Sequence, residues 1–453
     1  MRLASERPKP WYKSNQPILC ALCGFACACL RAKAPQLCVG FVLWVAVMAL
    51  SLTVCDQQTP APQHVQTGLD VLVENHFDLL HGKRVGVITN HTGLTRDGRH
   101  LVDLLAQAPN VTLTAIFGPE HGVRGSAPAG AKVSTRRDSV TGVVVYSLYG
   151  KTRRPTSEML ANLDVLVFDI QDVGARFYTY IYTMALSMEA AAQHGKTFVV
   201  LDRPNPITGR HVEGPMLQPG FESFVGLFPL PVRHGLTVGE LAQMFKGERW
   251  IAGADSLDLR VVKMTGWRRD LWLDQTDVPW GAPSPSMRTL ATATVYPGTC
   301  FIEGTNVSEG RGTPYPFEQI GAPWIDGETL ARALNDLRLP GVTFEPVTFT
   351  PVAQPPSVLH PKFRDQTCSG VFLRVTDRDA FRPVRTGVAL VWTIRNRYPR
   401  HFQWRPGIDR LYGSDRLRKA VDAGQPLAEI VARFDEETRA FLALRSRYLM
   451  YPP

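Results

Sequence analysis

Short apolar runs alternate with amphipathic stretches along the first half of the chain. The runs that predict buried strands cover residues 83–89, 111–117, 143–146, 164–169 and 197–201. Apolar residues at helical spacing predict helices over residues 100–107 and 178–194, the second ending at Gly195. Fully apolar strands that alternate with helices are typical of a parallel sheet covered on both faces. The pattern therefore predicts an α/β fold built on a Rossmann-like, doubly wound parallel sheet.

A second, smaller region follows a stretch rich in proline and glycine, residues 280–313. Its predicted helices cover residues 327–337, 415–423 and 427–434, and its predicted strands cover 342–348 and 370–375. This mixture predicts an auxiliary α/β domain. The predicted organisation is a leader over residues 1–55, a linker over 56–66, the Rossmann-like domain over 67–290 and the auxiliary domain over 291–453, which completes a cleft.

The first 55 residues have the character of an export signal. Residues 39–54 form an uncharged apolar run that is preceded by Arg31 and Lys33 and ends at Cys55. This resembles a bacterial lipoprotein signal in which Cys55 is lipidated, although Val54 stands where such signals have a small residue. An uncleaved membrane anchor and an ordinary cleaved signal peptide are the alternatives. All three predict an exported protein that is periplasmic or membrane-anchored.

Charge and cysteine are concentrated in this leader rather than in the body. The net charge is +9, but the first 38 residues hold six basic residues and one acid, which leaves +4 for the rest. Because the body has no dense basic stripe, we expect no nucleic-acid partner. Six of the eight cysteines lie in the first 55 residues. The two in the body, Cys300 and Cys368, are expected to be buried free thiols.

Polar side chains follow four of the predicted strands at the point where each strand ends. Ligands bind outside the carboxyl ends of the strands in open α/β sheets, so we expect these side chains to gather at one site. Any one of them alone could instead cap a helix or lie in a solvated turn. In chain order the four groups are Asn90; Glu120, His121 and Arg124; Asp169, Gln171, Asp172 and Arg176; and Asp202, Arg203 and Asn205.

Glu120 has the strongest functional signal of these residues. It lies in FGPEHGVRG, residues 117–125, where Pro119 and Gly122 shape a tight turn that can hold a carboxyl group for acid catalysis. His121 could orient Glu120, touch substrate or hydrogen-bond the turn. A metal site of Glu120, His121 and Asp172 does not match a known ligand pattern, so we expect no metal. We expect no cofactor either, because no dinucleotide fingerprint, P-loop or HExxH motif is present.

A second polar cluster occupies the glycine-rich, aromatic-flanked segment 301–324. It contains Glu303, Asn306, Glu309 and Arg311. Amides and carboxylates bond sugar hydroxyls, and aromatic rings cover the apolar faces of pyranose rings, so this composition suits sugar recognition. The alternative is an interdomain loop whose acids pair with nearby arginines.

Several long motifs, found in order along residues 68–451, resemble the exo-β-N-acetylmuramidase family, the NamZ/YbbC-like proteins formerly described as a domain of unknown function. The motifs are GPEHGVRG, DIQDVGARFYTYIYTM, VLDRPNPITG, PLPVRHGLTVGELA, TATVYPGTCFIEGTNVSEGRGT and RSRYLMY. The resemblance implies release of N-acetylmuramic acid from the non-reducing ends of peptidoglycan fragments, in a cleft between a Rossmann-like domain and an auxiliary domain. The proposed catalytic glutamate of the family falls on Glu120.

The resemblance leaves the other roles open. Glycosidases commonly use two carboxyl groups. The partner of Glu120 could be the substrate's own acetamido group, or Asp172, Glu303 or Glu309. The lactyl carboxylate of muramic acid calls for a bidentate arginine, and the candidates are Arg124, Arg203, Arg311 and, by preference, Arg176. The alternative functions are a non-catalytic cell-wall sugar-binding lipoprotein and another hydrolase, an amidase or esterase, that uses the same cleft.

Overall fold

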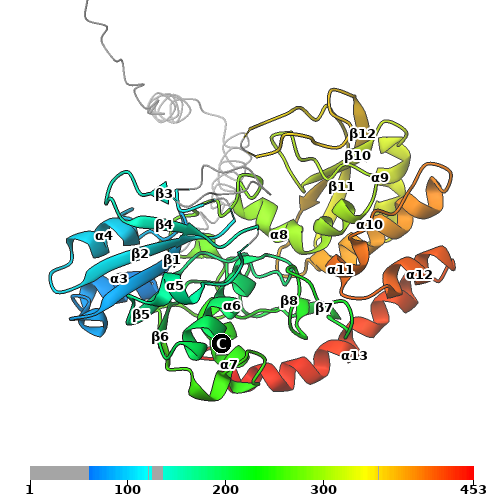
Figure 1. The fold of residues 1–453 in the computed structure, drawn as a ribbon. Coiled ribbons are helices and arrows are strands. Elements are labelled where there is room, and N and C mark those ends of the chain that lie inside the picture. The colour runs from blue at the N-terminus through cyan, green and yellow to red at the C-terminus, as the bar shows by residue number, and fades with distance from the viewer. Residues whose placement is uncertain (1–60, 121, 125–135, 151, 356) are drawn as a thin grey trace, which may run out of the picture. The chain divides into compact units, whose positions relative to one another are not determined.

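The first half of the described chain folds around a seven-stranded sheet with strand order β3-β4-β2-β1-β5-β6-β9 (Figure 1). The structure is a computed structural model and describes residues 61–453 except 121, 125–135, 151 and 356. Every neighbouring pair of strands is parallel except β3 with β4. The strands are β1 (Arg84–Thr89), β2 (Thr112–Gly118), β3 (Arg136–Arg137), β4 (Val144–Ser147), β5 (Val165–Asp169), β6 (Thr197–Leu201) and β9 (Leu259–Val262). The five predicted strands are confirmed, whereas β3 and β9 were not predicted.

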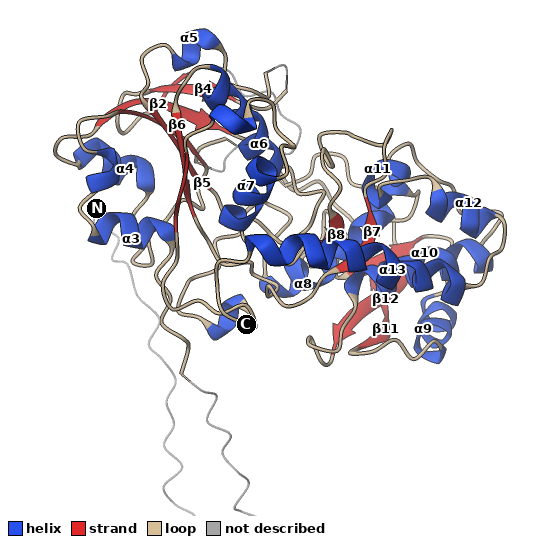
Figure 2. Cartoon of the chain, turned by 90° about the horizontal axis from the view of Figure 1, so that it is seen from below, coloured by secondary structure: helices blue, strands red, loops and turns tan. Residues whose placement is uncertain are grey.

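Helices cover both faces of this sheet, as the sequence predicts (Figure 2). Successive side chains of a strand point to opposite faces. Val167 of β5 therefore lies in one apolar core, and its neighbour Phe168 lies in the other. The core that contains Val167 is covered by α3 (Gly68–Glu74) and α4 (Leu101–Gln107). The core that contains Phe168 is covered by α5 (Ser157–Leu160), α6 (Tyr180–Gln193) and α7 (Val238–Gly247).

The second half holds a three-stranded antiparallel sheet, so the predicted smaller α/β region is confirmed. Its order is β10 (Gln319–Ala322), β12 (Cys368–Val375), β11 (Val342–Phe349). Its helices are α8 (Leu290–Thr299), α9 (Gly327–Asp336), α10 (Pro383–Arg397), α11 (Ile408–Tyr412), α12 (Arg416–Asp422) and α13 (Leu427–Arg445). A hairpin of β7 (Glu213–Met216) and β8 (Pro231–Arg233) precedes this region. Short 3-10 turns complete the described elements: η1 (Asp78–Leu80), η2 (Ala254–Ser256), η3 (Leu273–Gln275), η4 (Cys300–Gly304) and η5 (Ser446–Tyr448).

Six described helices were not predicted from the sequence, namely α3, α5, α7, α8, α10 and α11, and α13 is longer than predicted. Helix α8 lies inside the stretch that was predicted to be a proline- and glycine-rich connection, and it includes Pro297. The backbone of α8 packs directly against the start of α10. A Cβ on Gly298 would lie only 1.8 Å from the carbonyl oxygen of Pro383. Gly298 and Gly387 thus let the backbones of α8 and α10 touch, which local helix propensity does not reveal. Helix α10 was not predicted either, and α13 runs to Arg445 instead of ending at residue 434.

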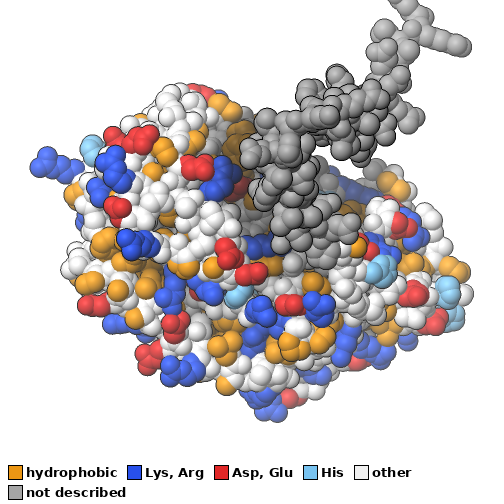
Figure 3. Space-filling model, turned by 180° about the vertical axis from the view of Figure 1, so that it is seen from behind, with side chains coloured by type: hydrophobic (Ala, Val, Ile, Leu, Met, Phe, Trp, Pro, Cys, Tyr) orange, Lys and Arg blue, Asp and Glu red, His pale blue; other side chains and the backbone are white. Residues whose placement is uncertain are grey.

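The remaining sequence-level expectations concern thiols, charge and membrane spans. Cys300 and Cys368 are free and buried, as predicted. On the face drawn in Figure 3, acidic and basic side chains are interspersed over the described surface. Within residues 61–453, none of the described helices is long and apolar enough to cross a bilayer. The leader, including Cys55, lies outside the described residues.

The segment after α13 returns to the first region and docks there. The Tyr451 hydroxyl donates to Asp202 Oδ2 at 2.5 Å, and the backbone N–H of Met450 donates to Glu240 Oε1 at 2.8 Å. Asp202 is fully buried after β6 and also accepts from the Thr237 hydroxyl at 2.8 Å. Burial raises the pKa of Asp202 to about 7, although these hydrogen bonds oppose the shift. The domain boundary predicted at residue 290 stays a prediction, because residues 450 and 451, which lie after it, contact residues that lie before it.

We expect the buried Asp202 to make stability depend on pH. Its carboxyl has a pKa of about 7 in the folded chain and about 3.9 when unfolded. Between about pH 4 and pH 7 the Asp202 carboxyl is protonated in the folded state but ionised in the unfolded state. Its contribution to the free energy of unfolding is therefore fully present below about pH 4 and is lost as the pH rises through about 7. Urea unfolding of wild type and Asp202→Asn should show the variant gaining free energy of unfolding relative to wild type across this window. A difference that stays constant with pH would contradict the assignment.

Candidate active site

The loops that follow the parallel strands meet at one edge of the sheet, as the sequence predicts. The Thr89 hydroxyl at the end of β1 donates to the carbonyl oxygen of Asp169 at the end of β5, at 2.8 Å. The Gln171 side chain donates to the carbonyl oxygen of Pro204, in the loop after β6, at 2.8 Å. These bonds join the ends of β1, β5 and β6 into one layer.

Most of the polar side chains in this layer are satisfied by the protein itself. Asp169 and Arg203 form a buried ion pair, with Nη2 2.9 Å from Oδ2. Asn90 accepts from the backbone N–H of Thr92, and the amide of Asn205 donates to a backbone carbonyl at 3.0 Å. Asn90, Asp169, Gln171, Arg203 and Asn205 were predicted to bind substrate. The structure shows them bonding neighbouring loops outside the pocket described below, and their role in substrate binding stays a prediction.

Four further candidates also lie outside the pocket described below. Arg176 is fully buried and donates to the backbone carbonyls of Pro215, Leu230 and Leu411. Burial lowers its pKa to about 10. Arg124 pairs with Asp103 and Asp138. The Asn306 amide bridges to the backbone at residues 401 and 403, and Asp172 accepts from the backbone N–H of Gly174 at 2.7 Å. Arg176 therefore has a structural role, and the expectation that it recognises a substrate carboxylate stays a prediction.

A pocket of about 210 Å³ lies among the loops at this edge and residues of the second half. The sheet contributes Glu120 after β2 and Tyr149 after β4, while the segment before α6 contributes Tyr178. From the second half come Glu303 of η4 and Arg311. The structure thus brings together Glu120, Glu303 and Arg311, three of the residues chosen from sequence. His121 lies outside the described residues, so its predicted role stays a prediction.

Glu120 is held at the pocket by hydroxyl groups. The Thr179 hydroxyl donates to Glu120 Oε2 at 3.2 Å, and Tyr149 hydrogen-bonds the same carboxyl group. Burial, followed by the negative charge of Glu120, raises the pKa of Tyr149. The turn beneath is fixed by a hydrogen bond from Gly122 N to the Pro119 carbonyl oxygen, and Gly122 has a φ of 71° that favours glycine. These contacts hold the carboxyl group in one place, as acid catalysis requires.

Glu303 enters the same pocket paired with Arg311. Arg311 Nε donates to Glu303 Oε1 at 2.8 Å, and Nη1 donates to the Ser286 hydroxyl at 2.8 Å. The guanidinium also lies over the ring of Phe317, 4.9 Å from its centroid. Burial would lower the pKa of Arg311, but the charges of Glu303 and Glu309 outweigh it and raise that pKa. Arg311 therefore stays cationic beside Glu303.

Glu309 lies behind this pair and does not line the pocket. Its Oε2 is 2.9 Å from Lys362 Nζ, and its Oε1 is 3.8 Å from Arg311 Nε. Burial would raise its pKa, but Lys362 and then Arg311 outweigh burial and lower it. Lys362 also donates to the carbonyl oxygens of Ile302 and Val307 at 2.8 Å. Glu309 and Lys362 thus brace the loop that carries Glu303 and Arg311.

Comparisons with known proteins identify the family. Residues 85–291 match the N-terminal model of the exo-β-N-acetylmuramidase NamZ, and residues 294–451 match its C-terminal model. The chain belongs to the NamZ family. It is 49% identical over 396 residues to the peptidoglycan β-N-acetylmuramidase NamZ of Bacillus subtilis strain 168, across 87% of this chain and 93% of that protein.

Two solved structures share this NamZ-family fold. Both are crystal structures of DUF1343 family proteins from Bacteroides fragilis NCTC 9343. One has a TM-score of 0.79 at 38% identity, and the other has a TM-score of 0.71 at 33% identity. Each comparison covers 86% of this chain and 99% of the solved chain.

Several pocket residues were not chosen from the sequence. They include Tyr149, Phe177, Tyr178, Thr179 and Tyr296. The available signal was the tyrosine-rich run at residues 178–182, which was interpreted as the start of a helix. Tyr149 carries no local pattern, because it reaches the pocket only through the folding of the chain.

We expect the Glu309–Lys362 brace to be important for stability. Lys362→Met would leave a buried carboxylate without its closest counter-charge, so the free energy of unfolding should fall by about 3–5 kcal/mol. Lys419→Met is the matched control, because that side chain is 68% exposed and pairs with Asp415 at the surface. The control should change stability by about 0.5 kcal/mol or less in urea denaturation. Equal effects of the two variants would contradict the role of the brace.

Proposed function

We propose that this protein is an exo-acting glycoside hydrolase that releases N-acetylmuramic acid from the non-reducing ends of peptidoglycan fragments in cell-wall recycling. The observation that carries the proposal is the pocket in which Glu120 lies with the Glu303–Arg311 pair. The muramidase named in Bacillus subtilis, 49% identical over most of both chains, supports the same activity. A pocket of about 210 Å³ is small, which suits one terminal sugar better than the middle of a glycan strand.

In this mechanism Glu120 is the general acid that protonates the leaving glycosidic oxygen. The hydroxyls of Thr179 and Tyr149 keep its carboxyl group oriented. We assign the second carboxyl role to Glu303, because Asp172 lies outside the pocket and Glu309 is occupied by Lys362. Glu303 lies in the same pocket as Glu120 and is held in place there by its hydrogen bond from Arg311.

Arg311 replaces Arg176 as the proposed partner of the lactyl carboxylate. Of the four arginines considered from sequence, Arg311 lines the pocket, whereas Arg124, Arg176 and Arg203 are engaged elsewhere. A guanidinium recognises a carboxylate through paired N–H donors. Arg311 can serve the substrate while it keeps its contact with Glu303.

For location, we propose that the body is exported and acts in the periplasm or at a membrane. The support is the uncharged run over residues 39–54, with basic residues before it and Cys55 after it. A lipid on Cys55 would hold the enzyme near its peptidoglycan substrate.

The test of the catalytic assignment is release of chromophore from a β-glycoside of N-acetylmuramic acid. Glu120→Gln should lower the turnover by about 10²- to 10⁴-fold, because the amide cannot donate the acid proton. Glu345→Gln is the matched control, since Glu345 lies on β11 in a surface pair with Arg374, and its turnover should equal that of wild type.

Equal turnover by wild type and Glu120→Gln would reject Glu120 as the acid. Binding of the sugar without turnover by wild type would favour the sugar-binding lipoprotein. Release of peptide or acyl groups, with no release of the sugar, would favour an amidase or esterase.

The leader gives a separate prediction. In a host that processes lipoproteins, mass spectrometry of the membrane fraction should find the mature chain beginning at a lipid-modified Cys55. A soluble chain cleaved at another position would instead support ordinary secretion, and an intact unmodified leader would support a membrane anchor.

A further inference from the structure

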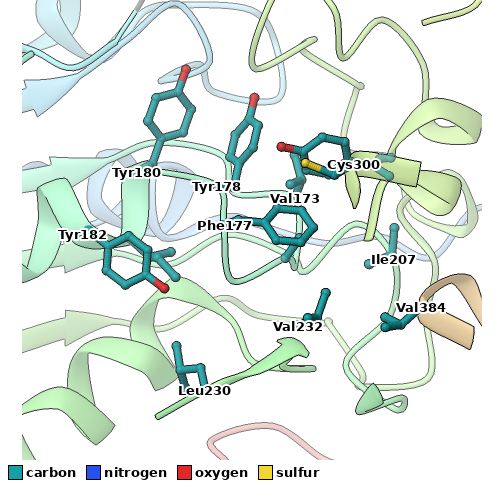
Figure 4. Close-up of a cluster of buried hydrophobic side chains, with 14 of the residues drawn as sticks. Val173, Phe177, Tyr178, Tyr180, Tyr182, Ile207, Leu230, Val232, Cys300 and Val384 are labelled. Atoms are coloured by element: carbon teal, nitrogen blue, oxygen red, sulfur yellow. The ribbon is translucent and has the colours of Figure 1, made fainter. Parts of the chain in front are cut away.

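Three tyrosines occupy alternate positions at the start of α6: Tyr178 precedes the helix, and Tyr180 and Tyr182 lie in its first turn. Figure 4 shows the rings of Tyr178 and Tyr180 with their hydroxyls directed the same way, whereas the Tyr182 hydroxyl is directed oppositely. The Tyr180 hydroxyl donates to the Pro283 carbonyl oxygen at 2.7 Å. The Tyr178 hydroxyl lies near Ser284 and the Tyr182 hydroxyl near the backbone of Leu227, but neither makes a hydrogen bond of normal geometry among the described residues.

Tyr178 differs from Tyr182 in its surroundings. Tyr178 lines the pocket that holds Glu120 and is 8% exposed, whereas Tyr182 is not among the pocket residues and packs against Phe228, with ring centroids 6.2 Å apart. A buried hydroxyl that lacks a partner costs free energy, so a ligand that supplies an acceptor there gains affinity. Of these two hydroxyls, the one on Tyr178 belongs to a side chain that lines the pocket, so it is the one that a ligand in this pocket can engage.

The Tyr178 hydroxyl is available as a donor. Burial raises its pKa, and the charges of Glu120 and Asp172 raise it further, while the neighbouring Ser284 opposes the shift. The phenol therefore keeps its proton at neutral pH. Two carboxylates nearby disfavour an anionic acceptor, so the acceptor that suits this position is a neutral oxygen.

Aromatic rings form the wall beside this donor. Tyr296 stands edge-on to Tyr178 with a centroid distance of 5.9 Å and edge-on to Phe177 at 5.3 Å. Both Phe177 and Tyr296 line the pocket. An aromatic wall next to a neutral donor matches an acetamido group, whose carbonyl oxygen accepts a hydrogen bond and whose methyl group needs apolar contact.

We propose that Tyr178, Phe177 and Tyr296 form the subsite for the N-acetyl group of the substrate, with the Tyr178 hydroxyl donating to the acetamido oxygen. This inference rests on the proposed function and specifies how the sugar is oriented in the pocket. The neutral acetamido group faces the aromatic wall near Glu120. The anionic lactyl group is directed toward Arg311 instead, where the guanidinium offsets its charge.

Binding measured by isothermal titration calorimetry tests the subsite without relying on turnover. The ligands are N-acetylmuramic acid and 3-O-lactyl-glucose, which carries a hydroxyl in place of the acetamido group. Tyr178→Phe should weaken binding of N-acetylmuramic acid by about 5- to 100-fold, because one hydrogen bond is lost. Binding of 3-O-lactyl-glucose should change by about twofold or less.

Tyr182→Phe is the matched control, because it removes a buried hydroxyl four residues farther along the chain than Tyr178 and outside the pocket. It should leave binding of both ligands unchanged. Thermal unfolding of both variants should stay close to wild type, since each loses a hydroxyl that makes no hydrogen bond of normal geometry among the described residues. In steady-state assays on the chromogenic N-acetylmuramic acid glycoside, Tyr178→Phe should raise KM by the same factor that it weakens binding.

Unchanged binding of N-acetylmuramic acid by Tyr178→Phe, or an equal loss for both ligands, would overturn the subsite. Absence of turnover by wild type would reject the proposed hydrolase. A selective loss of N-acetylmuramic acid binding in Tyr178→Phe would still support the subsite in that case.

Discussion

The parallel pairing of β2, β1, β5 and β6 is the constraint on which the rest of the structure depends. Parallel strands must all end at the same edge, so every loop that follows a strand is delivered to one side of the sheet. The loops after β1, β5 and β6 use their polar side chains to bond one another, as the buried Asp169–Arg203 pair shows. This leaves a firm layer on which the loops after β2 and β4 place Glu120 and Tyr149.

The sequence could predict five strands of the sheet and a distinctive turn at Glu120, because both follow from local patterns. Apolar continuity revealed the five main strands, and the proline–glycine turn revealed Glu120. The sequence could not distinguish a polar side chain that lines a pocket from one whose hydrogen bonds are all made to other parts of the protein. Arg176 and Arg311 look alike in sequence, yet Arg176 bonds three backbone carbonyls and Arg311 lines the pocket. Whether backbone acceptors lie within reach depends on distant segments, as it does for α8, whose Gly298 packs against α10.

The charges around the pocket alternate in sign from its surface into the protein. Glu303 contacts Arg311, Arg311 approaches Glu309, and Glu309 contacts Lys362. Buried ion pairs are costly to desolvate, and they persist where each partner is also hydrogen-bonded. Lys362 meets that condition through two backbone carbonyls. The arrangement places a carboxyl group and a cationic guanidinium side by side at the pocket.

The bond between Tyr451 and Asp202 has a consequence for biosynthesis. The two residues are separated by 249 positions, although they contact each other in the finished protein. At a synthesis rate of roughly 5–20 residues per second, Asp202 is made roughly 10–50 seconds before Tyr451. Until Tyr451 is made, the hydrogen bond from its hydroxyl to Asp202 cannot form. The buried carboxyl group of the first region therefore depends for one of its donors on a segment that is synthesised much later.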